Sequence, residues 1–197
     1  MERIAERITK EDCTLERLVT TIPLADYVPR CVDVPKFLAY CKDCPSYGTR
    51  WSCPPHDYDP MDLWARYEAL SLVVLVITPS PGIGRVRAMD ILAREKNTLL
   101  EELLALESKV PGSLALSAGN CQLCRFCGRT RGEPCCHPER MRPSIEALGG
   151  DVSLTLEHYL GRTIQWTRPG EPPQYLTLAG GLLIPDGWKG GGHGSAL

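Results

Sequence analysis

Three cysteines at two-residue gaps, Cys121-Gln-Leu-Cys124-Arg-Phe-Cys127, constrain this chain more than any other feature. In a Cys-x-x-Cys gap the backbone turns back on itself, so that both sulfurs can face one metal. A third thiol at the same gap extends that arc around a cuboidal cluster, as in the bacterial ferredoxin run, where a fourth cysteine is followed by proline. Here the fourth position falls to Cys135 or Cys136, in the segment Glu-Pro-Cys-Cys-His-Pro. Because adjacent side chains diverge, we expect only Cys135 to be a ligand.

A second cysteine block lies upstream, in Cys41-Lys-Asp-Cys44-Pro and Trp51-Ser-Cys53-Pro-Pro. It supplies three thiols, and Cys31 lies further upstream of the Cys41 pair. If Cys31 is only a core thiol, this block leaves one iron of a cluster open to substrate or sulfide, which would make the protein an enzyme. Alternatively the two blocks interleave, as in two-cluster ferredoxins. The sequence therefore leaves both the number of clusters and enzymatic activity open.

Zinc is the alternative metal. A structural zinc site takes four ligands in a tetrahedral array, which Cys41 and Cys44 with Cys121 and Cys124 could supply. The third thiol of the triplet, Cys127, argues against zinc, because a zinc knuckle has no use for it in that register. Iron–sulfur ligation uses the triplet directly. We predict one or two [4Fe-4S] clusters as the cofactor, and the ligand set is Cys41, Cys44, Cys53, Cys121, Cys124, Cys127 and Cys135.

The charged N-terminal segment lacks the apolar core of a secretory signal. The longest apolar run, Leu70 to Ile77, is too short for a bilayer, which needs ~20 residues. Thiols kept inside a cell stay reduced, and dense cysteine spacing then indicates metal binding. We therefore expect a cytoplasmic protein with no membrane contact.

The net charge of −2 and pI near 6.1 give no general attraction to nucleic acid. A local cluster of five arginines surrounds the second block, at positions 125, 129, 131, 140 and 142. These arginines either offset the charge of a thiolate-ligated cluster or dock a partner. We expect such a partner to be an acidic redox protein or a small anionic substrate. The oligomeric state is not predictable.

The hydrophobic pattern predicts an α/β fold, with α+β as a variant. We expect a short helix within residues 1–20, a helix over 62–70, a buried strand over 72–77, a long helix over 85–109 and a strand over 113–117. Two short helices over 143–148 and 154–160 and a late strand over 175–184 with a glycine break follow. The small sheet should carry one long crossover helix and two cysteine-rich metal loops at one edge. We expect one domain over 1–186, with cysteine blocks at 31–56 and 119–138, and a flexible glycine-rich tail over 187–197.

Both blocks together resemble a family described as predicted metal-binding proteins, a cysteine-rich domain of unknown function. The first signature is Cys41-x-x-Cys44-Pro-x-Tyr-Gly followed by Trp-x-Cys53-Pro-Pro-His. The second is Cys121-x-x-Cys124-x-x-Cys127, then Pro-Cys135-x-x-Pro, then Arg142-Pro-Ser144-x-Glu146-Ala. The resemblance covers roughly residues 28 to 185 and implies metal binding without assigning a reaction. It implies that Cys135 rather than Cys136 is the family cysteine, and we expect Arg142, Ser144 and Glu146 to brace the cluster loop.

Overall fold

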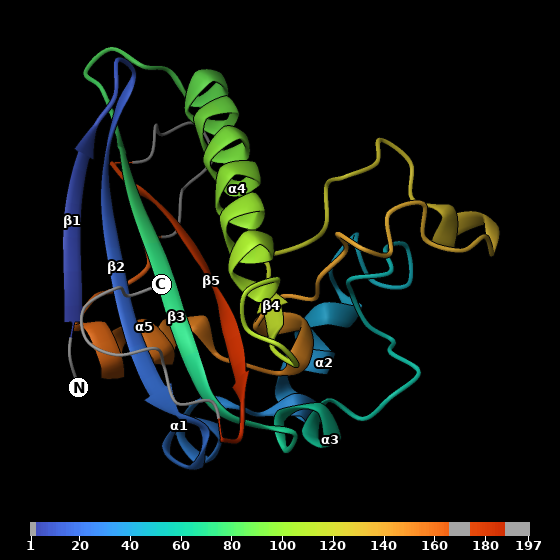
Figure 1. Ribbon diagram of the computed structural model, residues 1–197. Coiled ribbons are helices and arrows are strands. Elements are labelled where there is room, and N and C mark those ends of the chain that lie inside the picture. The colour runs from blue at the N-terminus through green and yellow to red at the C-terminus, as the bar shows by residue number, and fades with distance from the viewer. Residues whose placement is uncertain (1–2, 166–173, 188–197) are drawn as a thin grey trace.

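The computed structural model describes residues 3–165 and 174–187, and its centre is a sheet of five strands (Figure 1). The strand order is β1-β2-β3-β5-β4, and every neighbouring pair is antiparallel. The strands are β1 (Arg3–Thr9), β2 (Cys13–Pro23), β3 (Tyr67–Pro79), β4 (Leu114–Leu116) and β5 (Leu176–Pro185). The helices are α1 (Leu24–Cys31), α2 (Val34–Lys42), α3 (Pro60–Trp64), α4 (Arg85–Glu107) and α5 (Val152–Leu160), with 3-10 turns η1 (Gly128–Arg131) and η2 (Glu146–Leu148). This combination of sheet and helices confirms the α/β prediction.

The central strand β3 is buried on both faces, as its continuously apolar sequence predicts. Alternate side chains of a strand point to opposite faces. Leu72 and Val74 therefore pack in one core with α1 and α5, while Val73 and Leu75 pack in a second core under α4. The sheet is thus a middle layer with an apolar core on each side.

Helix α4 connects β3 to β4, and these two strands run parallel to each other with β5 between them. The predicted crossover helix over 85–109 is therefore confirmed, and it ends at Glu107. Its buried stripe includes Ile91, Glu95 and Leu99, whereas Met89 is 46% exposed. Glu95 is tolerated there because Lys10 and Arg94 both pair with its carboxylate.

The short helix expected within residues 1–20 is wrong, because β1 and β2 form a hairpin there. Ile4 and Ile8 are four residues apart, a spacing that fits one face of a helix and one face of a strand equally. Leu15 and Leu18 have an odd separation and lie on opposite faces of β2, one in each core. The pairing of β2 with the buried β3 along its whole length settles the choice.

The glycine break expected in the late strand is also wrong, since β5 runs without interruption through Gly180 and Gly181. A Cβ atom on Gly180 would lie 2.7 Å from the Leu116 carbonyl oxygen, and one on Gly181 would lie 2.6 Å from that of Ser71. Glycine lets β5 approach both of its neighbours closely. Here it allows the strand to fit rather than ending it.

The other predicted helices are shorter or displaced. The helix over 62–70 is α3, which ends at Trp64 because β3 begins at Tyr67. Only η2 forms within 143–148, while α5 begins at Val152 behind Asp151, whose side chain accepts the Leu154 amide. The tail predicted over 187–197 lies, apart from Gly187, outside the described residues.

Both cysteine blocks lie beyond the β4 edge of the sheet, as expected (Figure 1). The first block runs from the end of α1 through α2 into the loop after it, and the second follows β4. Within residues 3–165 and 174–187, no helix has the length and apolar character needed to cross a membrane.

Candidate metal centre

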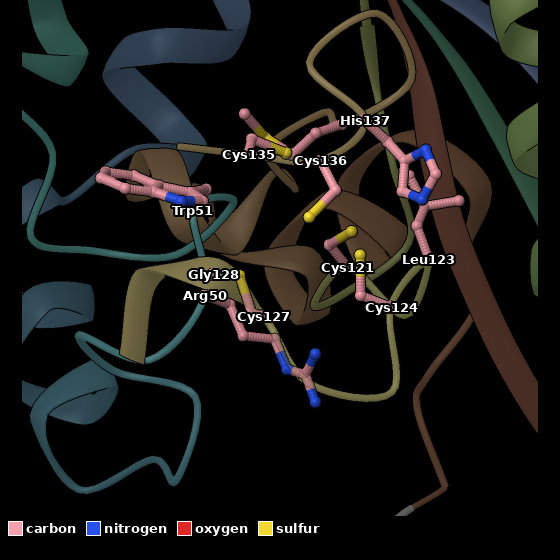
Figure 2. A pocket seen from close by; sticks show the side chains of 11 residues that line it. Arg50, Trp51, Cys121, Leu123, Cys124, Cys127, Gly128, Cys135, Cys136 and His137 are labelled. Atoms are coloured by element: carbon pink, nitrogen blue, oxygen red, sulfur yellow. The ribbon is translucent and has the colours of Figure 1, made fainter. Parts of the chain in front are cut away.

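Five thiols of the second block line one small cavity (Figure 2). They belong to Cys121, Cys124, Cys127, Cys135 and Cys136. Arg50 and Trp51 of the first block contribute to the same wall. The enclosed volume is about 10 Å³, which is about the space of one water-sized sphere. A cluster would therefore require this loop to widen around it.

The start of this loop is fixed by the end of β4. Ser117 donates its amide to the Pro143 carbonyl at 2.8 Å, and its hydroxyl donates to the Arg142 carbonyl at 3.1 Å. Further along, the Thr130 amide donates to the Cys127 carbonyl at 3.3 Å, and η1 turns the chain back toward Cys135. The backbone thus holds the triplet and the later cysteines in one loop.

Cys136 lies closer to the triplet than the sequence indicates. Figure 2 shows its sulfur directed toward Cys121 and Cys124, while the Cys135 sulfur lies farther from them. Burial raises the pKa of Cys124, and the neighbouring Cys136 and Cys121 thiols add to this rise. Cys135 also lines the cavity, and burial raises its pKa. Both adjacent cysteines are therefore placed as candidates for the fourth thiol.

The first block brings three more thiols together. Cys41 lies in the last turn of α2, and the Cys44 amide donates to its carbonyl at 3.0 Å. Burial raises the pKa of Cys41, with further contributions from Cys53 and Cys44. Burial also raises the pKa of Cys53, which is influenced by Cys44 and by Cys121 of the other block. Cys53 thus lies between the two thiol groups.

The remaining thiols belong to the core. Cys31 is 1% exposed and packs on the α1 and α5 side, and Cys13 is completely buried in β2 under α4. Cys31 is therefore a core thiol, and the first block offers three cysteines.

Within the described part of the chain, no three Cys, His, Asp or Glu side chains converge as they would around one metal ion. The donor chemistry is nevertheless clear, because every candidate ligand is a thiol. Soft thiolates select zinc or iron–sulfur clusters over hard cations. The residues present therefore fit a thiolate-bound metal centre.

The two blocks are fastened to each other by direct hydrogen bonds. Ser52 accepts the Cys121 amide at 3.0 Å, and the Asn120 amide nitrogen donates to Ser46 at 3.0 Å. The Trp51 indole donates to the Glu133 carbonyl at 3.1 Å. These contacts join segments that are separated in the sequence by β3, α4 and β4.

Arg129 is the largest single link between the blocks. Its guanidinium donates to the carbonyl oxygens of Arg50 at 2.8 Å, Cys53 at 2.6 Å and Pro55 at 2.5 Å. It also lies 5.1 Å from the centre of the Trp51 ring. One side chain of the second block thereby fixes the backbone around Cys53.

Three of the other clustered arginines also have acidic partners within the chain. Arg131 pairs with Glu133, Arg140 with Glu101 and Arg142 with Glu107. Arg125 lies over the Phe126 ring at 5.4 Å. Arg142 and Ser144, which we expected to brace the loop, both have partners. Arg142 is held by Glu107 of α4. The Ser144 hydroxyl accepts a hydrogen bond from the Ala147 amide at 3.2 Å.

Sequence reasoning missed the importance of Lys96 and the position of Glu146. The Lys96 ammonium donates to the carbonyl oxygen of Asn120 at 2.5 Å and to its side-chain oxygen at 3.3 Å. Burial lowers the pKa of Lys96, while the nearby Cys121, Glu146 and Cys53 oppose this change. Burial raises the pKa of Glu146, whose Oε2 is buried without a hydrogen-bond partner in the described structure. No local motif marks Lys96, and the signature that contains Glu146 does not show that the two residues meet, because their meeting depends on the fold.

The residues of both blocks also lie within one family match. Comparison with curated proteins and with solved structures gave no match. A family model described as predicted metal-binding protein (DUF2284) matches residues 30–184, which include every thiol placed in the two blocks. On this match the chain belongs to the family of predicted metal-binding proteins.

Proposed function

We propose that this protein carries [4Fe-4S] clusters and acts in electron transfer or in cluster-dependent redox or sulfur chemistry. The observation that carries the proposal is the gathering of thiols from a single loop around one cavity. Cys121, Cys124 and Cys127 would hold three irons, and either Cys135 or Cys136 would hold the fourth. A bound cluster supplies reversible electron transfer at a potential that the surrounding protein tunes.

The arrangement of the thiols favours a cluster over zinc. Zinc–sulfur bonds are ~2.3 Å long, so four zinc ligands must converge on one point. In a four-iron cluster each thiolate binds a different iron, and the sulfurs surround the group without converging. The second block supplies a third thiol in the triplet, Cys127, which a cluster uses and a zinc knuckle does not. Zinc bound as a structural or interaction module is the alternative.

A second candidate function is an enzyme that uses an open iron. The first block offers Cys41, Cys44 and Cys53, one thiol fewer than a four-iron cluster needs. A cavity of about 170 Å³ lies directly beside Cys41 and is also lined by His56 and Tyr58. A three-thiol group next to a cavity is the arrangement that an open-site cluster requires.

The first test is the metal content of protein purified anaerobically. We expect a brown protein with about four or about eight irons per chain and matching acid-labile sulfide. Eight irons would indicate that both blocks are loaded, and four irons that one is. A colourless protein with stoichiometric zinc, after reconstitution with iron and sulfide has also failed, would refute the cluster proposal.

Serine variants then identify the ligands. We expect Cys124→Ser to lose one cluster, because serine is a poor replacement for a soft thiolate. Cys135→Ser and Cys136→Ser form a matched pair in which only the variant that removes the fourth ligand should lose iron. Cys13→Ser is the control, since Cys13 lies in the core away from both blocks. Unchanged iron in Cys124→Ser would remove that residue from the ligand set.

We further propose a cytoplasmic location and a redox partner protein. A reducing compartment keeps thiols available for metal, and all ten cysteines are free in this structure. Phe126 is 69% exposed and lies next to Arg125, between Cys124 and Cys127 of the second block. An acidic partner that approached there would lie close to the cluster-binding thiols.

A further inference from the structure

A second and larger cavity opens beside the second cysteine block. It lies between α4, β5, the start of α5 and the loop that follows β4. Its volume is about 340 Å³, within the ~300–1,000 Å³ typical of small-molecule sites. The cavity exists because β4 pairs only with Gly181–Leu183, while β5 continues from there back to Leu176.

The wall of this cavity is mainly apolar, with a few polar groups gathered at one side. Leu92, Ala93, Leu178 and Ala179 contribute hydrocarbon surface. Lys96, Asn120 and Glu146 are among the polar residues that line it. Apolar walls with a small number of placed polar groups are the usual composition of a ligand site.

Lys96 brings a cation without a carboxylate partner to this cavity. Its hydrogen-bond partners in the described structure are the two oxygens of Asn120, neither of which carries a charge, and the nearby Glu146 forms no ion pair with it. By contrast, the Lys10 ammonium pairs with the buried Glu95 carboxylate of α4 at 2.7 Å. A partly buried ammonium without a direct ion pair is costly, and an anionic ligand in contact with it would relieve that cost.

Glu146 brings the complementary group. Its Oε2 is inaccessible to solvent and has no hydrogen-bond partner within the described residues. Burial raises the pKa of this carboxyl, and a protonated carboxyl can donate a hydrogen bond. The same side chain also lines the cavity beside Cys41, which places it between the larger cavity and the first block.

We propose that the cavity binds a small carboxylate with an apolar body, whose carboxylate accepts hydrogen bonds from Lys96 and Glu146. The hydrocarbon wall favours an apolar body over a compact inorganic anion. Asn120 lines the cavity and directly precedes Cys121, so the ligand lies next to the second thiol group. That this ligand is the substrate of the metal centre rests on the proposed function, whereas its binding does not.

The size of the cavity determines the probes. A cavity of ~150 Å³ accepts benzene, so this larger one has room for a ring with a short chain. Hexanoate and 3-phenylpropionate are the carboxylate probes, and 3-phenylpropionamide is the uncharged control of the same shape. Binding is measured by isothermal calorimetry on the full chain, and the iron content of the same samples is determined in parallel.

We expect at least one carboxylate to bind saturably, and the amide to bind about tenfold more weakly or worse, because it lacks the charge that Lys96 pairs with. Lys96→Met should weaken carboxylate binding by a similar factor. Ala93→Leu should weaken binding by narrowing the cavity while leaving the iron content unchanged, since Ala93 does not line either cavity that contains the thiols. Glu146→Gln should retain most of the affinity, because the amide group still donates.

The proposal is overturned if neither carboxylate saturates, if the amide binds equally well, or if Ala93→Leu binds like the wild type. If Lys96→Met also loses iron, its weaker binding no longer reports on the cavity alone, and the binding by Ala93→Leu then tests the proposal. Carboxylate binding to a chain that holds no iron even after reconstitution with iron and sulfide would retain this inference and refute the proposed function. An iron-loaded chain that binds neither carboxylate would overturn this inference and retain the proposed function.

Discussion

Arg129→Lys tests whether one side chain holds the two cysteine blocks together. The guanidinium donates to three carbonyl oxygens at 2.5 to 2.8 Å, whereas an ammonium at this place can keep about one of these contacts. Hydrogen bonds from charged donors contribute about 1.5–3 kcal/mol each. Water can reach the partly exposed carbonyl oxygens and offset part of the loss. We therefore expect the free energy of opening of residues 44–55 to fall by about 2–4 kcal/mol.

Amide hydrogen exchange measures this opening directly. The Gly48 amide donates to the Pro54 carbonyl and the Cys53 amide to the Arg50 carbonyl, so both report on this loop. A loss of about 2–4 kcal/mol would speed their exchange about 30- to 700-fold. Arg131→Lys is the matched control in the same turn and should leave exchange unchanged, because among the described residues the ion-pair partner of Arg131 is the exposed Glu133.

Equal exchange rates in Arg129→Lys and in the wild type would refute the reasoning, since they would show that other contacts hold the loop. Faster exchange in both arginine variants would show that the general positive charge matters rather than the three directed hydrogen bonds.

Three further predictions concern the fold and its pH dependence. Burial raises the pKa of Glu146 above its usual 4.5. The contribution of this group to the free energy of unfolding is therefore fully present below its unfolded pKa. That contribution falls as the pH rises between the unfolded and the native pKa, by up to about 1.4 kcal/mol per pH unit. Urea unfolding at several pH values should show this fall in the wild type and not in Glu146→Gln. Gly180→Ala should cost about 1–3 kcal/mol, because its Cβ would lie 2.7 Å from a carbonyl oxygen of β4. Gly84→Ala, where nothing lies within 4 Å of the added methyl, should cost less than about 1 kcal/mol, since it loses only the preference of the α4 N-cap for glycine over alanine, and similar urea midpoints for the two glycine variants would contradict the close-packing argument. Tyr27→Phe should lose about 1 kcal/mol in urea unfolding, since it removes the buried hydrogen bond to Thr155, and an unchanged midpoint would show that this bond contributes nothing.

The parts of the fold that sequence predicts are those with one dominant period. The run Leu72 to Ile77 could only be a strand buried on both faces, and the 85–109 segment could only be a helix. The helix predicted for the first twenty residues was wrong because the spacing of Ile4 and Ile8 fits both the helical and the strand period. The pairing of β2 with β3 decides in favour of the strand. Local sequence carries no information about that distant partner.

The candidate site likewise contains residues that local spacing predicts and residues that only the fold brings together. The grouping of Cys121, Cys124 and Cys127 around one cavity follows from local spacing. The approach of Cys136 to Cys124 depends on how the chain returns after η1. Lys96 and Glu146 come from α4 and η2, and only the three-dimensional fold brings them to one cavity. Residues that meet through tertiary structure leave no mark in the spacing of a motif.

The position of β5 has a consequence for biosynthesis. This strand is the last of the sheet in chain order, yet it lies between β3 and β4 and is the only strand paired with β4 among the described residues. The loop that carries Cys121 is anchored to the end of β4, so its support arrives only when Leu176–Pro185 has been synthesised. A nascent chain that ends before this strand would contain all ten cysteines and still lack the frame that aligns them. Metal loading should therefore be a post-translational event, and a truncation before Leu176 should abolish it without removing a single thiol.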